Sequence, residues 1–311
     1  MSESQPIPPA PAASSPAARA WQRFRRNRTA FGSFLFLLAT LAFLGGWPAL
    51  SPHGANITSE DQFQAPDGKF WCGTDIHGRD LFVRLCVGGQ VSLLVGVVGA
   101  CVSLVIGVTW GAVAGYGGGR IDAVMMRIVD VLYALPSIIF VMLLIAVVEG
   151  PVRRWAGGWV GGDVRVGLRL LFLCVGLGTV SWLTMARIVR GQVLTLRTRP
   201  FIDASRALGA SPLRLLGRHI LPNLAGVIIV YLTLTVPAVI LYESFLSFLG
   251  LGIQPPMASL GALIAEGASQ LNPIRTYWWL VVFPALALVV TLLALNFLGD
   301  GLRDALDPKS L

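Results

Sequence analysis

The chain of 311 residues is 55% hydrophobic and 13% charged, and its mean hydropathy is +0.71. Soluble domains use about 25% charged residues, so this composition excludes an ordinary soluble protein and indicates an integral membrane protein. The formal net charge of +8 comes almost entirely from arginine, because Lys69 and Lys309 are the only lysines.

The first 29 residues are rich in proline, alanine and serine, a composition that cannot bury a core. Residues 1–29 are therefore predicted to form a disordered, basic tail. The tail ends in five arginines: Arg19, Arg23, Arg25, Arg26 and Arg28. The apolar run that follows, Ala30–Leu50, is longer than the hydrophobic part of a signal peptide, which favours a retained membrane span over a cleaved leader.

Five further apolar runs are long enough to cross about 30 Å of hydrocarbon, which makes about six transmembrane helices. They are Val91–Val113, Val124–Val148, Leu168–Met185, Ala225–Leu246 and Tyr277–Leu298. With six spans both termini lie on one side of the membrane. That side carries 16 of the 24 lysines and arginines, so the positive-inside rule predicts that both termini are cytoplasmic.

This topology divides the chain into four parts. Residues 1–29 are the tail, and residues 30–90 hold the first span and an extracytoplasmic connection. Residues 91–298 form a five-helix core, and residues 299–311 are a cytoplasmic C-terminal tail.

The extracytoplasmic connection contains two acids, Asp75 and Asp80, on either side of His77. This spacing matches no established metal site, so a helix start capped by one of the acids is the preferred interpretation. Cys72 and Cys86 also lie on this side, where oxidation could join them, but nothing in the sequence fixes their geometry.

A glycine-rich turn follows the second span, in the sequence GAVAGYGGGRID at residues 111–122. Glycines before a helix can hold phosphate. However, no G-x-x-x-x-G-K-[ST] motif occurs, because Phe70 follows Lys69 and Pro308 precedes Lys309. The chain is therefore not expected to hydrolyse ATP, and the glycines are expected to let neighbouring helices pack closely.

Three polar or helix-breaking residues within the spans are candidates for a translocation path or gate. Pro136 and Pro237 are each expected to kink a span. Glu243 is a carboxylate in an apolar segment, which is by default a functional hypothesis. Its place near the outer end of its span leaves a solvated, interfacial glutamate as an equal alternative.

One long polar stretch, RPFIDASRALGASPLRLLGRHILPN at residues 199–223, interrupts the second half of the chain. Pro200 suits the first turn of a short helix that Gly209 ends, and Ser211–Pro212 suits the start of a second one. Pro222 is expected to stop the second helix near residue 221. The stretch is predicted to form an elbow of two short helices.

One face of the first elbow helix is a small apolar knob with charged edges, suited to a groove on a partner. The knob consists of Phe201, Ala204, Ser205 and Leu208, flanked by Asp203 and Arg206. From spacing alone, a basic connection that merely follows the topology rules is an equal alternative.

Six motifs follow one another along the chain. They are GTDIHGRD (73–80), AGYGGGRID (114–122), MARIVRGQVL (185–194), the elbow, ESFLSFLGLGIQPP (243–256) and NFLGDGLRDALDP (296–308). Over residues 25–308 the chain resembles the second, C-type permease subunit of bacterial ATP-binding-cassette (ABC) importers of the dipeptide, oligopeptide and nickel group. The resemblance implies an all-α membrane protein of the type I ABC importer permease fold in the bacterial cytoplasmic membrane.

In that family the elbow is similar to the EAA loop, which joins the permease to its ATPase. The matching positions here are Asp203 for the usual glutamate, Ala204, Ser205 for the second alanine, Gly209, and Ile220, Leu221 and Pro222 for the distal part. The resemblance implies that these residues, with Phe201, Arg206 and Leu208, couple the permease to ATP hydrolysis.

The resemblance also implies the partners: a second permease subunit, two ABC ATPase subunits and an extracytoplasmic solute-binding protein, besides membrane lipid. The ATPases would bind ATP and Mg²⁺, so no cofactor and no nucleic acid is expected on this chain. Di- or oligopeptides are the preferred cargo, with nickel or another small solute as the alternative. A secondary transporter is a remote alternative because the spans offer few ionisable residues.

Overall fold

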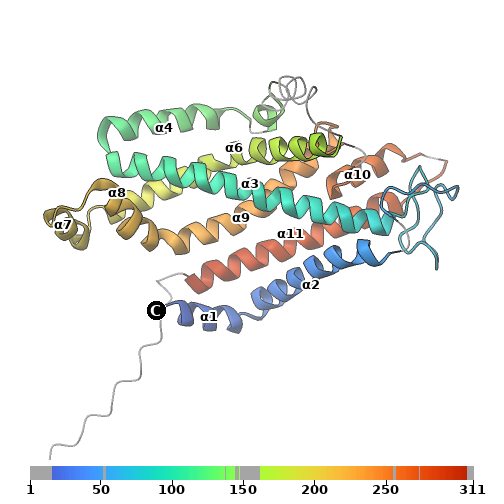
Figure 1. Ribbon diagram of the computed structural model, residues 1–311, viewed down its shortest axis with the longest axis horizontal. Helices are drawn as coiled ribbons and strands as arrows, with labels where there is room; N and C mark the ends of the chain where they lie inside the picture. Colours follow the sequence, from blue (N-terminus) through green and yellow to red (C-terminus); the bar gives the residue numbers. More distant parts are fainter. Residues whose placement is uncertain are drawn as a thin grey trace, which may run out of the picture.

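The computed structural model describes residues 16–51, 54–136, 138–143, 147, 162–254, 257–272 and 274–306. All named elements within these ranges are helices, and five of them are long and apolar enough to cross a membrane. They are α2 (Arg28–Leu50), α3 (Leu81–Gly117), α6 (Gly162–Leu196), α9 (Leu221–Phe248) and α11 (Trp279–Leu306). They run together along the long axis of the molecule (Figure 1). The predicted all-α membrane fold is confirmed.

The predicted span 124–148 begins in α4 (Gly119–Ala134) and extends into residues outside the described ranges. The helix ends before Pro136, where Leu135 takes an extended conformation with φ −79° and ψ 134°. Helical geometry is disfavoured for the residue before a proline, so the helix is interrupted here and not merely kinked. Pro237, by contrast, lies inside the continuous helix α9.

The predicted disorder of residues 1–29 is wrong for the second half of this tail. Pro16–Arg26 form helix α1, and Asn27 separates it from α2 by capping α2 with its side-chain oxygen, 3.2 Å from the amide nitrogen of Ala30. The helix forms because Phe24 is buried against Ala30 and Ala305, a long-range contact that composition does not reveal. Residues 1–15 lie outside the described residues.

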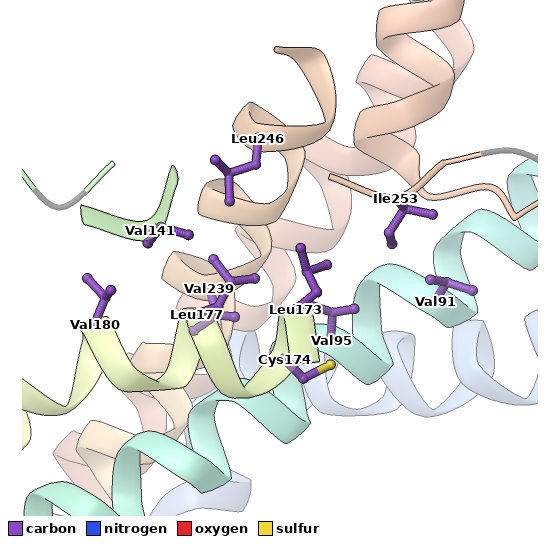
Figure 2. Packing of buried hydrophobic residues seen from close by; sticks show 10 residues of the cluster. All are labelled: Val91, Val95, Val141, Leu173, Cys174, Leu177, Val180, Val239, Leu246 and Ile253. Atoms are coloured by element: carbon purple, nitrogen blue, oxygen red, sulfur yellow. The ribbon is translucent and has the colours of Figure 1, made fainter. Parts of the chain in front are cut away.

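The centre of the bundle is formed by α3, α6 and α9. Figure 2 shows apolar side chains from these helices meeting in one cluster, with Val95, Leu177 and Val239 completely buried. Fully burying side chains of this size stabilises the fold by about 1.5–3 kcal/mol each in a soluble protein. Between helices in a membrane, close packing takes over that role.

Glycines bring α3 and α6 into close contact at every fourth residue, as the glycine-rich sequence predicts. A Cβ atom on Gly107 would lie 2.6 Å from the Cβ of Met185, and one on Gly111 would lie 2.5 Å from the carbonyl oxygen of Ala186. The two backbones therefore touch where larger residues would hold them apart.

We expect Gly111→Ala to lower the free energy of unfolding by about 1–3 kcal/mol, because the added methyl group meets backbone that cannot turn away. Gly191→Ala on α6 is the matched control, since its Cβ would have no neighbour within 4 Å. The control should be neutral or slightly stabilising through helix propensity. Equal thermal stability of both variants in detergent would contradict the close packing of α3 on α6.

Candidate functional site: the elbow and its supports

The elbow lies at one end of the bundle, and α10 (Leu260–Ser269) with the connection 54–80 lies at the other (Figure 1). Its first helix, α7 (Pro200–Ala207), starts with Pro200 in the first turn, after an extended Arg199. Gly209 follows the helix with φ +82°, a left-handed conformation that glycine adopts without strain. The predicted start and bend of the elbow are confirmed.

The second helix does not stop before Pro222, so that prediction is wrong. α8 (Pro212–Leu215), which Ser211 caps, passes through a π-helical turn, η1 (Leu216–Ile220), directly into α9. The π turn pairs the amide of Leu221 with the carbonyl of Leu216, and Pro222 is the second residue of α9, directly after this turn. The elbow is thus continuous with a membrane helix.

Buried side chains fix the elbow to the bundle. Ile202 of α7 and Leu215 of α8 are completely or almost completely buried, and they pack with Val189 and Val193 of α6. Ile220 is buried in the same cluster. This position was predicted to take part in coupling, but the structure places it inside the chain, where it supports the elbow instead of facing a partner.

The opposite side of the elbow carries exposed apolar side chains. Leu208 is 89% exposed, Leu213 is 82% exposed and Phe201 is 43% exposed. Ala204 is also exposed, so the face predicted for the knob points away from the chain. Leu213 lies outside the predicted knob, although its place directly after the first-turn Pro212 of the second helix is a signal that could have included it.

The polar side chains of the knob are satisfied within α7. Arg206 and Asp203 form an exposed ion pair at 3.0 Å, and the Ser205 hydroxyl donates to the Phe201 carbonyl at 2.9 Å. Exposed pairs of this kind contribute about 0–1 kcal/mol, so Asp203 and Arg206 remain available to a partner. Serine at position 205 therefore adds no unpaired polar group to the surface.

The glycine turn between α3 and α4 lies near the elbow and is held by an arginine. Arg197 donates to the carbonyls of Gly115 and Tyr116 at 3.0 and 3.2 Å, which caps the end of α3. Gly118 has φ +62°, and a Cβ atom there would lie 2.5 Å from the Arg197 guanidinium. The Arg197 side chain therefore packs directly against this turn.

At the opposite end of the bundle Glu243 is fully buried. Its carboxylate accepts hydrogen bonds from the hydroxyls of Ser247 and Ser259 at 2.6 and 2.7 Å and from Ser92 at 3.3 Å. The alternative of a solvated, interfacial glutamate is therefore wrong, because the serines of α3, α9 and the α10 N-cap replace water.

Each of these serines also accepts a backbone N–H, so the Glu243 cluster fixes backbone as well as side chains. Ser92 accepts from Leu260, and Ser259 accepts from Ala262 at the start of α10. The cluster thereby ties the first turn of α10 to α3 and α9.

A second buried cluster, the Arg84 ion cluster, joins the first connection to α10. Arg84 is 1% exposed and lies 2.7 Å from the Asp75 carboxylate and 2.6 Å from the Glu266 carboxylate. Arg79 pairs with the same Asp75 oxygen at 2.6 Å. The sequence suggested Asp75 or Asp80 as a helix cap; Asp80 caps α3, whereas Asp75 belongs to this ion cluster.

The two cysteines at this end of the bundle, Cys72 and Cys86, are free, buried thiols. Burial, helped by the charge of Asp80, raises the pKa of Cys72 to about 12. At pH 8 this thiol is protonated, and only the thiolate reacts quickly with maleimides.

We therefore expect Cys72 to resist maleimide at pH 8 in a variant that lacks the other cysteines, and to react after unfolding. Lys69→Cys in a chain without native cysteines is the control, because Lys69 is well exposed in the same connection. Equal labelling rates at both positions would show that the connection is open.

The sequence matches two families. Residues 107–311 match the family described as binding-protein-dependent transport system inner membrane component. Residues 15–66 match the N-terminal TM domain of oligopeptide transport permease C.

Several characterised relatives match along nearly the whole chain. The oligopeptide transport system permease protein OppC of Haemophilus influenzae is 41% identical over 93% of this chain and 88% of its own length. The dipeptide transport system permease protein DppC of Bacillus subtilis is 44% identical over 93% of this chain and 85% of its own length. OppC of Escherichia coli K12 is 45% identical over 93% of this chain and 91% of its own length.

A solved structure has the same fold. It is a chain of the MetNI methionine ABC transporter in an inward-facing conformation, with a TM-score of 0.55, covering 73% of this chain and 98% of that chain. The two sequences are 21% identical, so the similarity concerns the fold alone.

Proposed function

Because this chain belongs to the family of binding-protein-dependent transport system inner membrane components, as a C-type peptide permease, we propose that it forms half of the path of an ATP-driven peptide importer. The second half would be a different permease subunit. Two ABC ATPase subunits would supply the energy, and an extracytoplasmic binding protein would deliver the peptide.

The observation that carries this proposal is the exposed apolar surface of the elbow on a rigid base. Leu208 and Leu213 at the bend are almost fully exposed, whereas Ile202 and Leu215 behind them are buried and hold the elbow in place. Exposed apolar groups on a fixed support suit a partner's groove. The elbow and both termini would then face the cytoplasm, in line with the distribution of arginine.

We assign the coupling contact to the exposed elbow residues, and Ile220, Leu221 and Pro222 to its junction with α9. The contact residues are Phe201, Asp203, Ala204, Ser205, Arg206, Leu208, Gly209 and Leu213. Because α8, η1 and α9 form one continuous helical segment, movement of the elbow would tilt α9. The ATPases must hold the elbow in both of their states while favouring different arrangements of the spans.

Pro136, Pro237 and Glu243 are proposed to shape the path rather than to bind cargo. Pro136 separates α4 from the residues that follow, and Pro237 and Glu243 lie on the same helix as the elbow junction. A tilt of α9 would therefore strain the hydrogen bonds of the Glu243 cluster and shift the start of α10.

Peptide is the proposed cargo because the relatives named for oligopeptide and dipeptide transport match over nearly the full chain. Nickel or another small solute is the alternative. A ligand screen on the companion binding protein separates them, since binding of peptides and not of nickel would support the proposal.

Purification of the tagged chain from its native membrane tests the assembly. We expect a second permease and ABC ATPases to co-purify in fixed ratio, and Leu208→Asp to release the ATPases while keeping the permease. A chain that purifies alone from a mild detergent and transports solute by itself in liposomes would contradict the proposal.

A further inference from the structure

One side of helix α1 packs against the bundle, which fixes the rotation of α1 about its own axis. Phe24 is 3% exposed and packs edge-to-face on Phe31 and Phe34 of α2, with ring centroids 6.3 and 6.1 Å apart. The same ring is buried against Ala305 in the last turn of α11. The short break at Asn27 leaves little freedom between α1 and α2.

This fixed rotation decides which residues of α1 face outward. Arg19, Gln22, Arg25 and Arg26 are exposed, and Trp21 is 49% exposed beside them. The buried Phe24 and the exposed arginines therefore lie on different sides of one short amphipathic helix.

The surroundings of α1 are strongly positive. The sequence has no acidic residue between Glu3 and Glu60. The nearest part of α11 adds Asp300, Arg303 and Asp304 to the five arginines of residues 19–28. These six arginines and two aspartates give the region a net charge of +4. The patch attracts an anionic surface.

Helix α1 lies beside the end of the apolar run of α11. α1 contacts the end of α11 where charged residues close its apolar run, and α2, which starts at Arg28, is the least buried of the candidate spans. Arginine pairs with phosphate through two parallel hydrogen bonds, and tryptophan prefers the headgroup level.

We propose that α1 is an interfacial helix that binds anionic phospholipid headgroups through Arg19, Arg25 and Arg26, together with Arg28 at the start of α2. Trp21 lies at the headgroup level beside them, and Phe24 anchors the helix to the protein. The inference does not depend on the cargo or on the ATPases.

Lipid retention by the full-length chain tests this site. The purified chain in detergent is given equimolar phosphatidylglycerol and phosphatidylcholine, and the retained lipids are counted by native mass spectrometry. We expect preference for phosphatidylglycerol, a loss of about fivefold in Arg26→Gln and of more than about tenfold in the Arg19→Gln/Arg25→Gln/Arg26→Gln variant.

The matched control removes the same charge elsewhere, in Arg120→Gln/Arg127→Gln/Arg214→Gln, whose arginines are exposed on α4 and α8. It should keep the preference. An equal loss of the phosphatidylglycerol preference in both triple variants would mean that only the net charge of the protein matters, and it would overturn the proposal. Displacement of the lipid by excess glycerol 3-phosphate would overturn it as well, because the site would then bind a free phosphate compound. Normal lipid preference in the α1 variant together with loss of a co-purifying subunit would make α1 a protein contact instead.

Discussion

Replacing Leu208 by aspartate is expected to reduce ATP-driven peptide uptake by about tenfold or more while leaving membrane insertion and thermal stability unchanged. The side chain is almost fully exposed, so the chain itself does not need it. A leucine that fills a partner's groove contributes through the apolar surface that it buries, and a buried, unpaired carboxylate in its place is costly. Uptake into proteoliposomes and co-purification of the ATPases measure the two consequences.

Leu208→Met is the conservative counterpart and should keep most of the uptake, because a methionine fills a similar volume. Ile274→Asp is the control for exposure, since Ile274 is equally exposed but lies outside the elbow. It should keep the ATPases bound. Retention of both the ATPases and normal uptake by Leu208→Asp would remove the elbow from the coupling contact.

Arg84→Met is expected to lower the free energy of unfolding by about 3 kcal/mol, the lower end of the range for breaking a buried ion pair. Arg84 is almost completely buried between Asp75 and Glu266. Its loss leaves Asp75 with Arg79 alone and Glu266 with a contact of 3.6 Å to Arg79. Thermal and denaturant unfolding in detergent measure the loss.

Lys69→Met is the matched control in the same part of the chain. It breaks the Lys69–Asp61 pair at 2.8 Å, whose side chains are 57% and 41% exposed, and should cost about 0–1 kcal/mol. A similar cost for both variants would mean that the Arg84 cluster is open to water and does not hold α10 to the first connection.

The local features of the elbow could be predicted from sequence because each depends on one or two residues. Pro200 marks a helix start, Gly209 marks a left-handed bend and Ser211 caps the next helix, all as observed. The continuation through Pro222 could not be predicted, because it depends on the π turn that the buried Leu215 and Ile220 stabilise.

Long-range contacts account for the other differences. The helix α1 depends on Phe24 reaching Ala305, almost the whole length of the chain away. The burial of Glu243 depends on Ser92 and Ser259 from two other elements. Neither partner is marked by any local pattern, whereas the close packing at Gly111 was predictable because small residues in membrane helices have few other roles.

Uptake of a labelled oligopeptide by proteoliposomes tests whether this chain forms part of an ATP-driven peptide importer. The liposomes would contain this chain, its companion permease and the ATPases, with ATP inside and the binding protein outside. We expect uptake that requires ATP, the binding protein and an intact Leu208. Uptake that persists without ATP and follows an imposed proton gradient would contradict it.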